Sequence, residues 1–390
     1  MSYRKFKADA LFTGTEILPA DRVLILDEQG VVESVVPFNE AGDGVEVMDG
    51  MLSPGFVNTH CHLELSHMKG KIAPGSGLVD FLIRVIKERT AAPELVQDAM
   101  QQAAEELYQG GTIAVADICN TADSARIKAA SNIHWRSFVE VLGFNEDNAA
   151  ERLQFAGRVQ EQFTTPATLS PHAPYSVSSN LFQFINQASA GEIITLHNQE
   201  AEAENELYQH KTGDFFRLYS NLSINADRFQ PSGKSSLQTY LPWLDKAATL
   251  LLVHNVAIRE QDILFAQKLT GTAIDLFFCI CINANKWISS TVPPLDLLRQ
   301  HQCHITLGTD SYASNYQLSI PEEIKTIQQA FPHIPLSEIL PWATLNGARA
   351  LQLDDKLGSF EKGKQPGVVL ISDVKKGKLT KESKAARLLS

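Results

Sequence analysis

The feature that most constrains the fold of this chain is a repeated alternation of short apolar runs with amphipathic segments. Eight β-prone apolar runs lie near residues 52–60, 112–119, 134–143, 167–172, 193–198, 248–255, 273–281 and 303–309. Apolar residues recur at helical spacing between most of them, in Val79–Arg89, Pro93–Tyr108, Ala149–Phe163, Asn180–Ala190, Arg259–Leu269 and Leu295–His301. This alternation predicts an α/β fold with a (β/α)8 TIM barrel. An open doubly wound sheet is the alternative, but its Gly-rich phosphate loop is absent from the sequence.

The two ends of the chain differ from this pattern. Residues 6–50 contain short β-like runs separated by turns, with no helical period. Residues 357–372 return to β-like runs near the other end. We therefore expect a small β-sandwich domain composed of residues 1–53 and 354–390, and a TIM barrel over residues 54–353.

Three further regions lie within or beside the predicted barrel. Helical spacing predicts helices at Pro321–Ala330 and Leu336–Leu351. Residues 213–242 form a long connection that contains Ser and Gly. Long connections on the top face of a barrel are frequently lids or specificity loops, so this segment is a candidate for either role.

Charge and composition exclude several classes of function. The formal net charge of −11 opposes long-range attraction to nucleic acid or to an anionic membrane. The N-terminus lacks the apolar core of a signal peptide, and no apolar run approaches the roughly 20 residues needed to cross a bilayer. The five cysteines are an odd number in a chain of 390 residues and imply no disulfide framework. We expect a cytoplasmic protein.

The first apolar run ends in two histidines one residue apart, in Asn58-Thr59-His60-Cys61-His62. Side chains at positions i and i+2 of a strand share a face, so His60 and His62 are expected to point the same way. Two converging imidazoles can chelate one divalent ion. Cys61 faces the opposite side and is expected to pack. The motif alone is equally consistent with two solvent-exposed histidines.

Other strand-like runs also end in polar residues. In barrel enzymes the chemistry lies at the C-terminal ends of the strands. The residues at these ends are His172, His197, Glu200, His254 and Asp310. Each has a structural explanation by itself, such as a hydrogen-bonded histidine or a helix N-cap for the aspartate. Their joint occurrence on one predicted rim indicates a catalytic site.

These motifs resemble the amidohydrolase superfamily, specifically its chlorohydrolase and aminohydrolase branch. The resemblance covers nearly the whole chain and rests on Pro54–His62, Ser170–Tyr175, His197–Glu200, Val253-His254, Gly308–Asn315 and Ala343–Arg349. The continuation His62-Leu-Glu-Leu-Ser66 and the segment Gly77–Leu82 are most similar to the aminodeoxyfutalosine deaminase group.

The resemblance implies that His60, His62, His197 and Asp310 bind a metal ion. His254 would then be either a ligand or a hydrogen-bonding partner of the attacking water. Relatives with two metals carry a carboxylated lysine at the end of strand four, where this chain has Leu169-Ser-Pro-His172. A single divalent ion is therefore expected, with zinc as the first choice and iron as the alternative.

The resemblance also implies hydrolytic deamination of an aromatic ring carbon. In this mechanism Asp310 accepts a proton from the metal-activated water, and His254 orients that water. Glu200 protonates the neighbouring ring nitrogen and then passes a proton to the departing ammonia.

Three residues are expected to contact the substrate: Glu64, Asp80 and His172. For Asp80 the alternative is an exposed carboxylate that favours a helix start through the helix dipole. The chain departs from many relatives at Ile282, where a proline is expected in the stretch that shapes the pocket.

The resulting functional hypothesis is a metal-dependent deaminase that acts on an aminated purine-like or other nitrogen heterocycle. A specific candidate substrate is 6-amino-6-deoxyfutalosine, in menaquinone biosynthesis. The alternatives are a chlorohydrolase acting on triazines, a cyclic amide hydrolase, and, from another class, a catalytically inactive barrel scaffold. The expected partners are a small heterocyclic substrate and a second copy of the chain as a homodimer, with no nucleic acid and no membrane.

Overall fold

The computed structural model describes residues 3–389. Eight parallel strands form its centre, in two four-stranded sheets of order β11-β10-β9-β8 and β12-β13-β14-β15. Their bounds are β8 (Phe56–Cys61), β9 (Thr112–Cys119), β10 (His134–Val141), β11 (Ala167–Pro171), β12 (Ile193–Asn198), β13 (Thr249–His254), β14 (Asp275–Ile280) and β15 (His304–Leu307). Each coincides closely with one of the eight predicted runs.

Backbone hydrogen bonds join the two sheets at both of their edges. Between β11 and β12, the N–H of His197 donates to the carbonyl of His172 at 3.0 Å. After β15, the N–H groups of Thr309 and Asp310 both donate to the carbonyl of His60 in β8, at 3.0 Å. The eight strands therefore close into a barrel, which confirms the predicted fold class.

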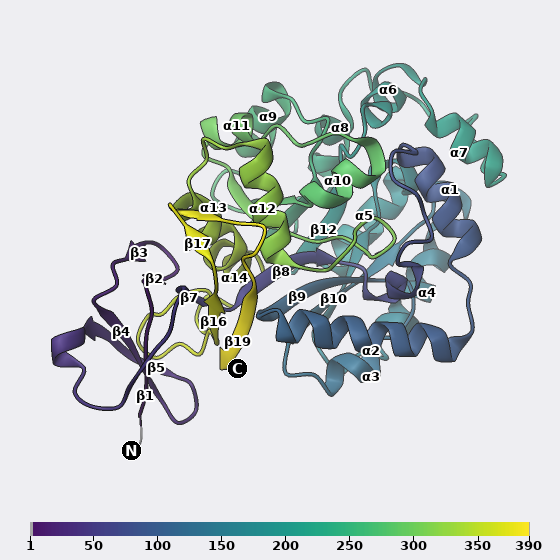
Figure 1. Cartoon of the computed structure of the whole chain (residues 1–390). Coiled ribbons are helices and arrows are strands. Elements are labelled where there is room, and N and C mark those ends of the chain that lie inside the picture. The colour runs from purple at the N-terminus through teal and green to yellow at the C-terminus, as the bar shows by residue number, and fades with distance from the viewer. Residues whose placement is uncertain (1–2, 390) are drawn as a thin grey trace.

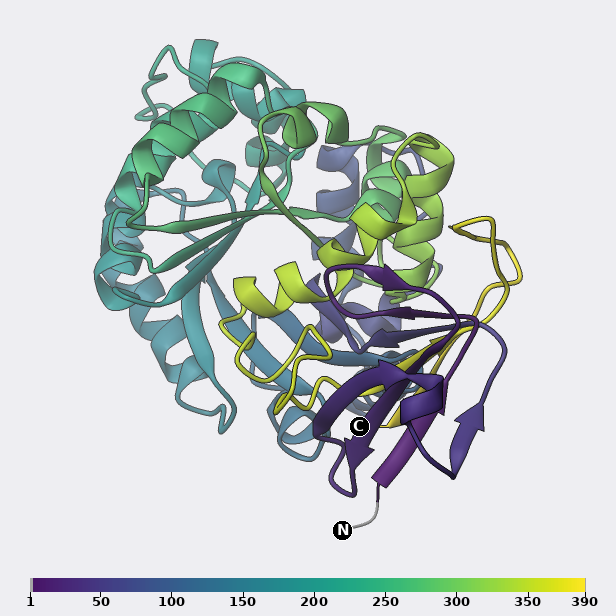
Figure 2. The ribbon, with the colours of Figure 1, turned by 90° about the vertical axis from the view of Figure 1, so that its left-hand side faces the viewer.

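Helices surround the barrel, as Figures 1 and 2 show. In α2, the buried residues Met100, Ala103, Ala104 and Leu107 follow helical spacing and form the face toward the strands. The larger helices are α1 (Leu78–Glu88), α2 (Pro93–Gln109), α4 (Ala149–Gln160), α5 (Ser179–Ala188), α6 (Glu202–His210), α9 (Glu260–Thr270), α10 (Ile282–Ser289) and α12 (Ile320–Ala330), with shorter α3 (Ala125–Ala129) and α11 (Leu295–Gln300).

The helix predicted over Leu336–Leu351 is wrong in one respect, because the structure has two helices there. The first is α13 (Leu336–Ala343) and the second is α14 (Leu345–Ala350). Thr344 between them has φ −134° and ψ −90°, outside helical values. The break lets α14 dock on β8 through Gly347, where a Cβ would lie only 2.7 Å from that of Val57.

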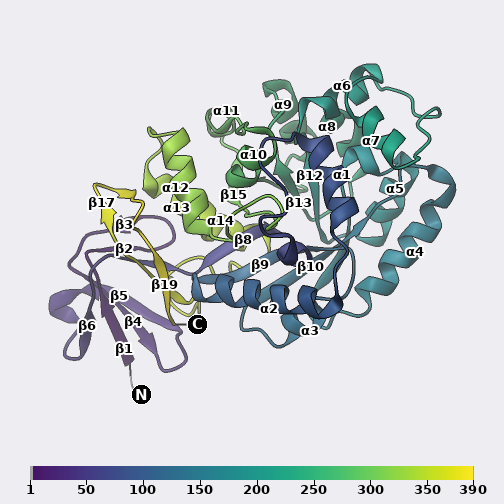
Figure 3. The same cartoon turned by 45° about the vertical axis from the view of Figure 1, so that its right-hand side comes forward.

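The segment 213–242 also contains regular structure, namely α7 (Phe215–Asn221), α8 (Ser236–Tyr240) and a short 3-10 turn. Helix α7 packs against α1, and the two stand together beyond the C-terminal ends of the strands (Figures 1 and 3). Within residues 3–389, no helix is long and apolar enough to span a bilayer.

Strands from both ends of the chain form the small β domain, beside the barrel (Figure 1). One sheet has the order β5-β4-β1-β6 and the other β19-β16-β7-β2-β3. Phe6, Leu24, Leu52 and Val368 are buried in their common core. The strands are β1 (Tyr3–Lys7), β2 (Ala10–Phe12), β3 (Ile17–Leu18), β4 (Arg22–Asp27), β5 (Val32–Pro37), β6 (Val45–Val47), β7 (Met51–Pro54), β16 (Val368–Ile371) and β19 (Ala385–Leu389), while β17 (Val374–Lys375) and β18 (Lys378–Leu379) form a separate hairpin.

Candidate active site

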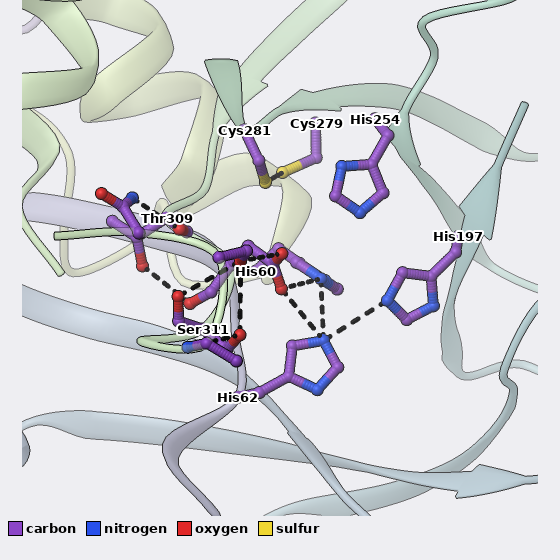
Figure 4. A network of polar contacts seen from close by, with 12 residues as sticks. His60, His62, His197, His254, Cys279, Cys281, Thr309 and Ser311 are labelled. Carbon is purple, nitrogen blue, oxygen red and sulfur yellow. Dashed lines mark hydrogen bonds and ion pairs between the residues drawn. The ribbon is translucent and has the colours of Figure 1, made fainter. Parts of the chain in front are cut away.

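Imidazole rings from three strands converge at the C-terminal end of the barrel (Figure 4). The Nε2 atoms of His60 and His62 lie 3.1 Å apart, and that of His197 lies 3.3 Å from that of His62. Burial lowers the pKa of His62 and His197, the latter to about 4, so both rings are neutral at pH 7. Neutral imidazole nitrogens that face each other at such distances are suitable ligands for a divalent cation.

A carboxylate completes this cluster. Asp310 Oδ1 lies 3.4 Å from Nε2 of His62 and 3.7 Å from Nε2 of His60, while Oδ2 accepts a hydrogen bond from Ser314 Oγ at 2.6 Å. Burial alone would raise the pKa of Asp310, but the nearby His60, His62 and His254 hold it well below its usual value. The group is therefore ionised and suits a cation. The site thus offers three imidazoles and one carboxylate, and this set of ligands fits a divalent metal ion.

His254, the last residue of β13, lies beside His197 of the neighbouring strand β12, with its ring centroid 5.5 Å from that of His197 and 5.6 Å from that of His60. Its Nδ1 lies 3.0 Å from the side-chain NH2 of Asn285, which donates to it. The ring proton is then on Nε2, which lies 3.6 Å from Glu200 Oε1. In this tautomer His254 is a hydrogen-bond donor toward the centre of the site.

Glu200 lies just after β12 and is buried, with 5% of its surface exposed. Burial raises its pKa well above the usual value, and the negative charges of Asp310 and Glu204 raise it further. These effects favour the protonated, neutral form of the Glu200 carboxyl group. A protonated carboxyl group beside a metal-type cluster can act as a general acid.

The backbone carbonyl of His172, just after β11, and the side chain of Glu140 in β10 lie against His197 Nδ1. His197 Nδ1 donates to the carbonyl of His172 at 2.8 Å, so its Nε2 lone pair faces the cluster. Glu140 Oε1 lies 3.5 Å from the same Nδ1. His172 itself contacts Ser176 Oγ through Nδ1 at 2.7 Å, and burial lowers its pKa to about 4.

A cavity of about 300 Å³ opens directly over these groups. His62, His172, His197, Glu200, His254 and Asp310 all line it, so the structure brings together most of the residues predicted from the strand ends. Phe81 and Val85 of α1 and Leu218 and Tyr219 of α7 form an apolar wall opposite. The cavity can enclose a flat heterocycle while keeping bulk water away.

Two of the expected substrate contacts do not reach the cavity. Asp80 lies on the outer side of α1, about half exposed, in an ion pair with Arg217. Glu64 is buried behind the cavity, where its carboxylate accepts hydrogen bonds from the N–H groups of Asn120 and Thr121, each at 3.0 Å. Both carboxylates are thus occupied by partners from the protein itself.

Several polar residues that line the cavity were not singled out from the sequence, among them Arg89, Asn120, Glu140 and Arg152. Asn120 follows the run at 112–119 and Glu140 lies near the end of the next run, so the rule that found the histidines would have found both. Arg89 immediately follows α1, and no local pattern distinguishes it from an exposed arginine.

Comparison with known sequences agrees with this geometry. A model of the amidohydrolase family matches residues 51–386. The 5'-deoxyadenosine deaminase of Methanococcus vannielii is 27% identical over 380 residues, which cover 91% of this chain and 84% of that protein. The aminodeoxyfutalosine deaminase of Nitratiruptor sp. is 26% identical over 337 residues, which cover 83% and 79%.

Solved structures show the same fold. Helicobacter pylori aminofutalosine deaminase in complex with methylthio-coformycin matches with a TM-score of 0.81 at 20% identity, over 99% of this chain and 98% of that one. An adenosine deaminase from Xanthomonas campestris with bound zinc matches with a TM-score of 0.70 at 23% identity, over 94% and 84%. Given the family match across most of its length, the chain belongs to the amidohydrolase family.

Proposed function

We propose that the protein is a metal-dependent hydrolytic deaminase that releases ammonia from the aminated purine of a nucleoside-like substrate. The observation that carries this proposal is that buried Glu200, whose pKa is raised, and Asp310, whose pKa is lowered, face the same histidine cluster, with Glu200 Oε1 3.6 Å from His254 Nε2 and Asp310 Oδ1 3.4 Å from His62 Nε2. Deamination needs both a proton donor for the ring and leaving amine, and a proton acceptor for water. The names of the relatives, which include deaminases of 5'-deoxyadenosine, aminodeoxyfutalosine and 5-methylthioadenosine/S-adenosylhomocysteine, support a purine nucleoside.

His60, His62, His197 and Asp310 would hold one divalent ion, for which we propose zinc, with iron as the alternative. The convergence of three Nε2 atoms and a carboxylate fits such an ion. When bound, it supplies Lewis-acid activation of water at neutral pH. The zinc in the Xanthomonas campestris neighbour is consistent with this choice.

The remaining side chains divide the proton transfers. Asp310 accepts the proton that water loses as it attacks the ring carbon. Glu200 gives its proton to the adjacent ring nitrogen, takes up the proton of the hydroxyl group now bonded to the ring carbon, and passes that proton to the amino group, which leaves as ammonia. The proton held by Asp310 then restores the proton of Glu200. His254 donates from Nε2 to orient the attacking oxygen, and His172 contacts the heterocycle from the cavity wall.

The test is a measurement of ammonia release from adenosine, 5'-deoxyadenosine and aminodeoxyfutalosine. Glu200→Gln should lower kcat by about 10²-fold or more, because the variant keeps the shape and loses the acid. Its metal content, measured by atomic spectroscopy, should match that of the parent. Glu151→Gln, on the exposed side of α4, is the matched control and should keep full activity. Full activity of Glu200→Gln would contradict the role.

The same screen separates the alternatives. Chloride needs no proton to depart, so a triazine chlorohydrolase would have less use for a proton donor at Glu200. A cyclic amide hydrolase would need such a donor but would open its ring without releasing ammonia. Release of chloride from a chlorotriazine without ammonia from any nucleoside would favour the first. A chain that binds no metal and turns over none of these compounds would be an inactive scaffold.

We also propose that the protein acts as a cytoplasmic homodimer on small molecules alone. Its net charge of −11 supports the absence of a nucleic-acid partner. Sedimentation equilibrium of the full chain measures the oligomeric state.

A further inference from the structure

We propose that Asn198 and Asn255 are positioning residues, a buried amide pair that holds His254 in a strained turn and so orients its Nε2 toward the reaction centre. This inference rests on the proposed deaminase function and adds to it the residues that control one of its proton-handling groups. Asn198 directly follows His197 as the last residue of β12, and Asn255 directly follows His254, the last residue of β13. Both asparagines are fully buried, and neither lines the cavity.

The backbone of His254 has a conformation that is uncommon for residues other than glycine. Its φ is +76°, and that of Asn255 is +59°. The N–H of Asn255 donates to the carbonyl of Val253 at 3.2 Å, so a three-residue γ-turn is centred on His254. A γ-turn with a positive φ at its centre is the rare and strained form. Strain of this kind persists only where the surrounding structure imposes it, and it is concentrated at functional sites.

A ladder of buried side-chain hydrogen bonds holds this turn. Asn198 Nδ2 donates to Asn255 Oδ1 at 2.9 Å, and Asn255 Nδ2 donates to the carbonyls of Leu252 at 2.8 Å and Cys279 at 3.2 Å. At the other end, Tyr240 Oη in α8 donates to Asn198 Oδ1 at 2.7 Å. We call the side chains of Tyr240, Asn198 and Asn255 the amide ladder. It joins β12, β13 and β14 behind the residues that face the cavity.

The turn determines where the imidazole of His254 points. Figure 4 shows this ring beside that of His197, and their centroids are 5.5 Å apart. In this orientation Nε2 lies 3.6 Å from Glu200 Oε1, and Nδ1 accepts from the amide of Asn285. Asn285 therefore sets the tautomer of the ring, whereas the amide ladder sets the direction of the whole residue. Loss of the ladder should let His254 relax toward an ordinary strand conformation and carry Nε2 away from the substrate.

Two substitutions remove the amide pair from opposite ends. Asn198→Ala deletes one amide, and Asn255→Gly deletes the other while it keeps the left-handed backbone conformation. In the metal-loaded full chain, each should lower kcat for adenosine by about 10²-fold, because a misplacement of about 1 Å costs that much. KM and metal content should stay at the parental values, because other side chains hold the substrate and the ion.

Asn186→Ala is the matched control, because it removes an equally connected buried amide outside the site. Asn186 Nδ2 donates to Asp245 Oδ1 at 2.8 Å, and Asn186 Oδ1 accepts the N–H of Lys246 at 3.0 Å. The residue lies in α5 and does not line the cavity. Asn186→Ala should lose stability to urea as Asn198→Ala does, but it should keep the parental kcat.

A double-mutant cycle tests whether the amide ladder acts through His254. In a His254→Ala background, Asn198→Ala should have no further effect on kcat, because the group that it positions is already absent. Effects on kcat that multiply would show that the ladder acts on another part of the site and would overturn the inference.

Crystal structures of the parent and of Asn255→Gly give a readout that does not depend on turnover. The φ of His254 should become negative in the variant, and its Nε2 should move away from Glu200 Oε1. An unchanged φ and distance, or a parental kcat with reduced stability, would overturn the inference and leave the ladder a structural element only. A parent that deaminates no aminopurine nucleoside would refute the proposed function, while the crystal structures would still decide whether the ladder positions His254.

Discussion

At the scale of single residues, the site places two carboxyl groups, whose pKa values are shifted in opposite directions, close to the same histidines. Asp310 is surrounded by imidazoles that hold its pKa down, whereas burial among few donors raises that of Glu200. Environment, not residue type, therefore assigns the base and the acid.

The tautomer of His254 yields a prediction at Asn285. The Asn285 amide donates to His254 Nδ1 and so leaves the ring proton on Nε2. In Asn285→Asp the new carboxylate would accept a hydrogen bond from Nδ1–H instead. The ring proton would then be on Nδ1, and Nε2 would lose its donor role. We expect kcat to fall by about 10²-fold or more with the metal retained, as measured by steady-state ammonia release. Unchanged kcat would show that His254 works equally well in the other tautomer.

Glu323 yields a prediction on pH and stability. It is fully buried and holds the loop after β15 by accepting from Asn283 Nδ2 at 2.9 Å and Asn315 Nδ2 at 3.0 Å. Burial raises its pKa to about 8. Between about pH 4.5 and 8 the native state therefore holds more protons at Glu323 than the unfolded state, so this group's contribution to stability falls as pH rises. Glu323→Gln should have a free energy of unfolding that decreases less over this window, as urea titrations at about pH 5 and 8.5 measure. An identical slope would contradict the assignment.

The residues at the site were predictable to different degrees. His60, His62, His197, His254 and Asp310 follow from the rule that polar residues at the ends of barrel strands meet. Their distances and protonation states do not, because these depend on burial by segments far away in sequence. Asp80 shows the limit in the other direction, since its partner Arg217 lies 137 residues away.

At the scale of elements, the chain turns sharply after the paired histidines of β8. Leu63–Met68 forms a 3-10 helix directly after His62, so the alternation of a strand ends there. Glu64 consequently leaves the face that His60 and His62 share. The sequence alone allows the strand to continue and would place Glu64 in the cavity, because no local residue pattern marks the change from strand to 3-10 helix.

The close approach of β15 to β8 yields a prediction at Gly308. A Cβ on this residue would lie 2.7 Å from His60 Cβ, 2.8 Å from Cys279 Sγ and 2.9 Å from Cys281 Sγ. Gly308→Ala should therefore displace His60, a proposed metal ligand, cost about 1–3 kcal/mol of stability and weaken the proposed metal binding. Thermal unfolding and metal titration measure both effects.

The matched control for that substitution is Gly157→Ala in α4, where a Cβ would meet no atom within 4 Å. Alanine is the better helix former, so this variant should gain about 0.5–1 kcal/mol. A stable Gly308→Ala variant with parental metal affinity would show that β15 moves away at little cost.

Strands and most helices were predictable because their hydrophobic periods are continuous. The exception at Thr344 arises from tertiary packing: Asn346 in α14 donates to the carbonyl of Ile305 in β15 at 2.9 Å, and Gly347 contacts β8. Such docking overrides a helical pattern that continues through the break.

At the scale of the whole molecule, the proposed ion would connect both halves of the barrel. His60 belongs to the β11-β10-β9-β8 sheet, His197 to the other sheet, and Asp310 follows β15 at the seam. Zinc at about 100 times its dissociation constant should therefore raise the free energy of unfolding by about 2.7 kcal/mol. Differential scanning calorimetry with zinc or with a chelator measures this, and His60→Ala should abolish the difference. An equal response of His60→Ala would place the ion elsewhere.

The shared sheet of the small domain has a consequence for the order of events during synthesis. Strand β7 ends at residue 54, and its partner β16 begins at residue 368. At the usual rates of translation, the ribosome needs on the order of tens of seconds to make the residues between them. During that interval one edge of β7 has no neighbour and can pair with the wrong chain. The time during which β7 of a nascent chain can mispair is thus set by the length of the barrel and not by the small domain itself.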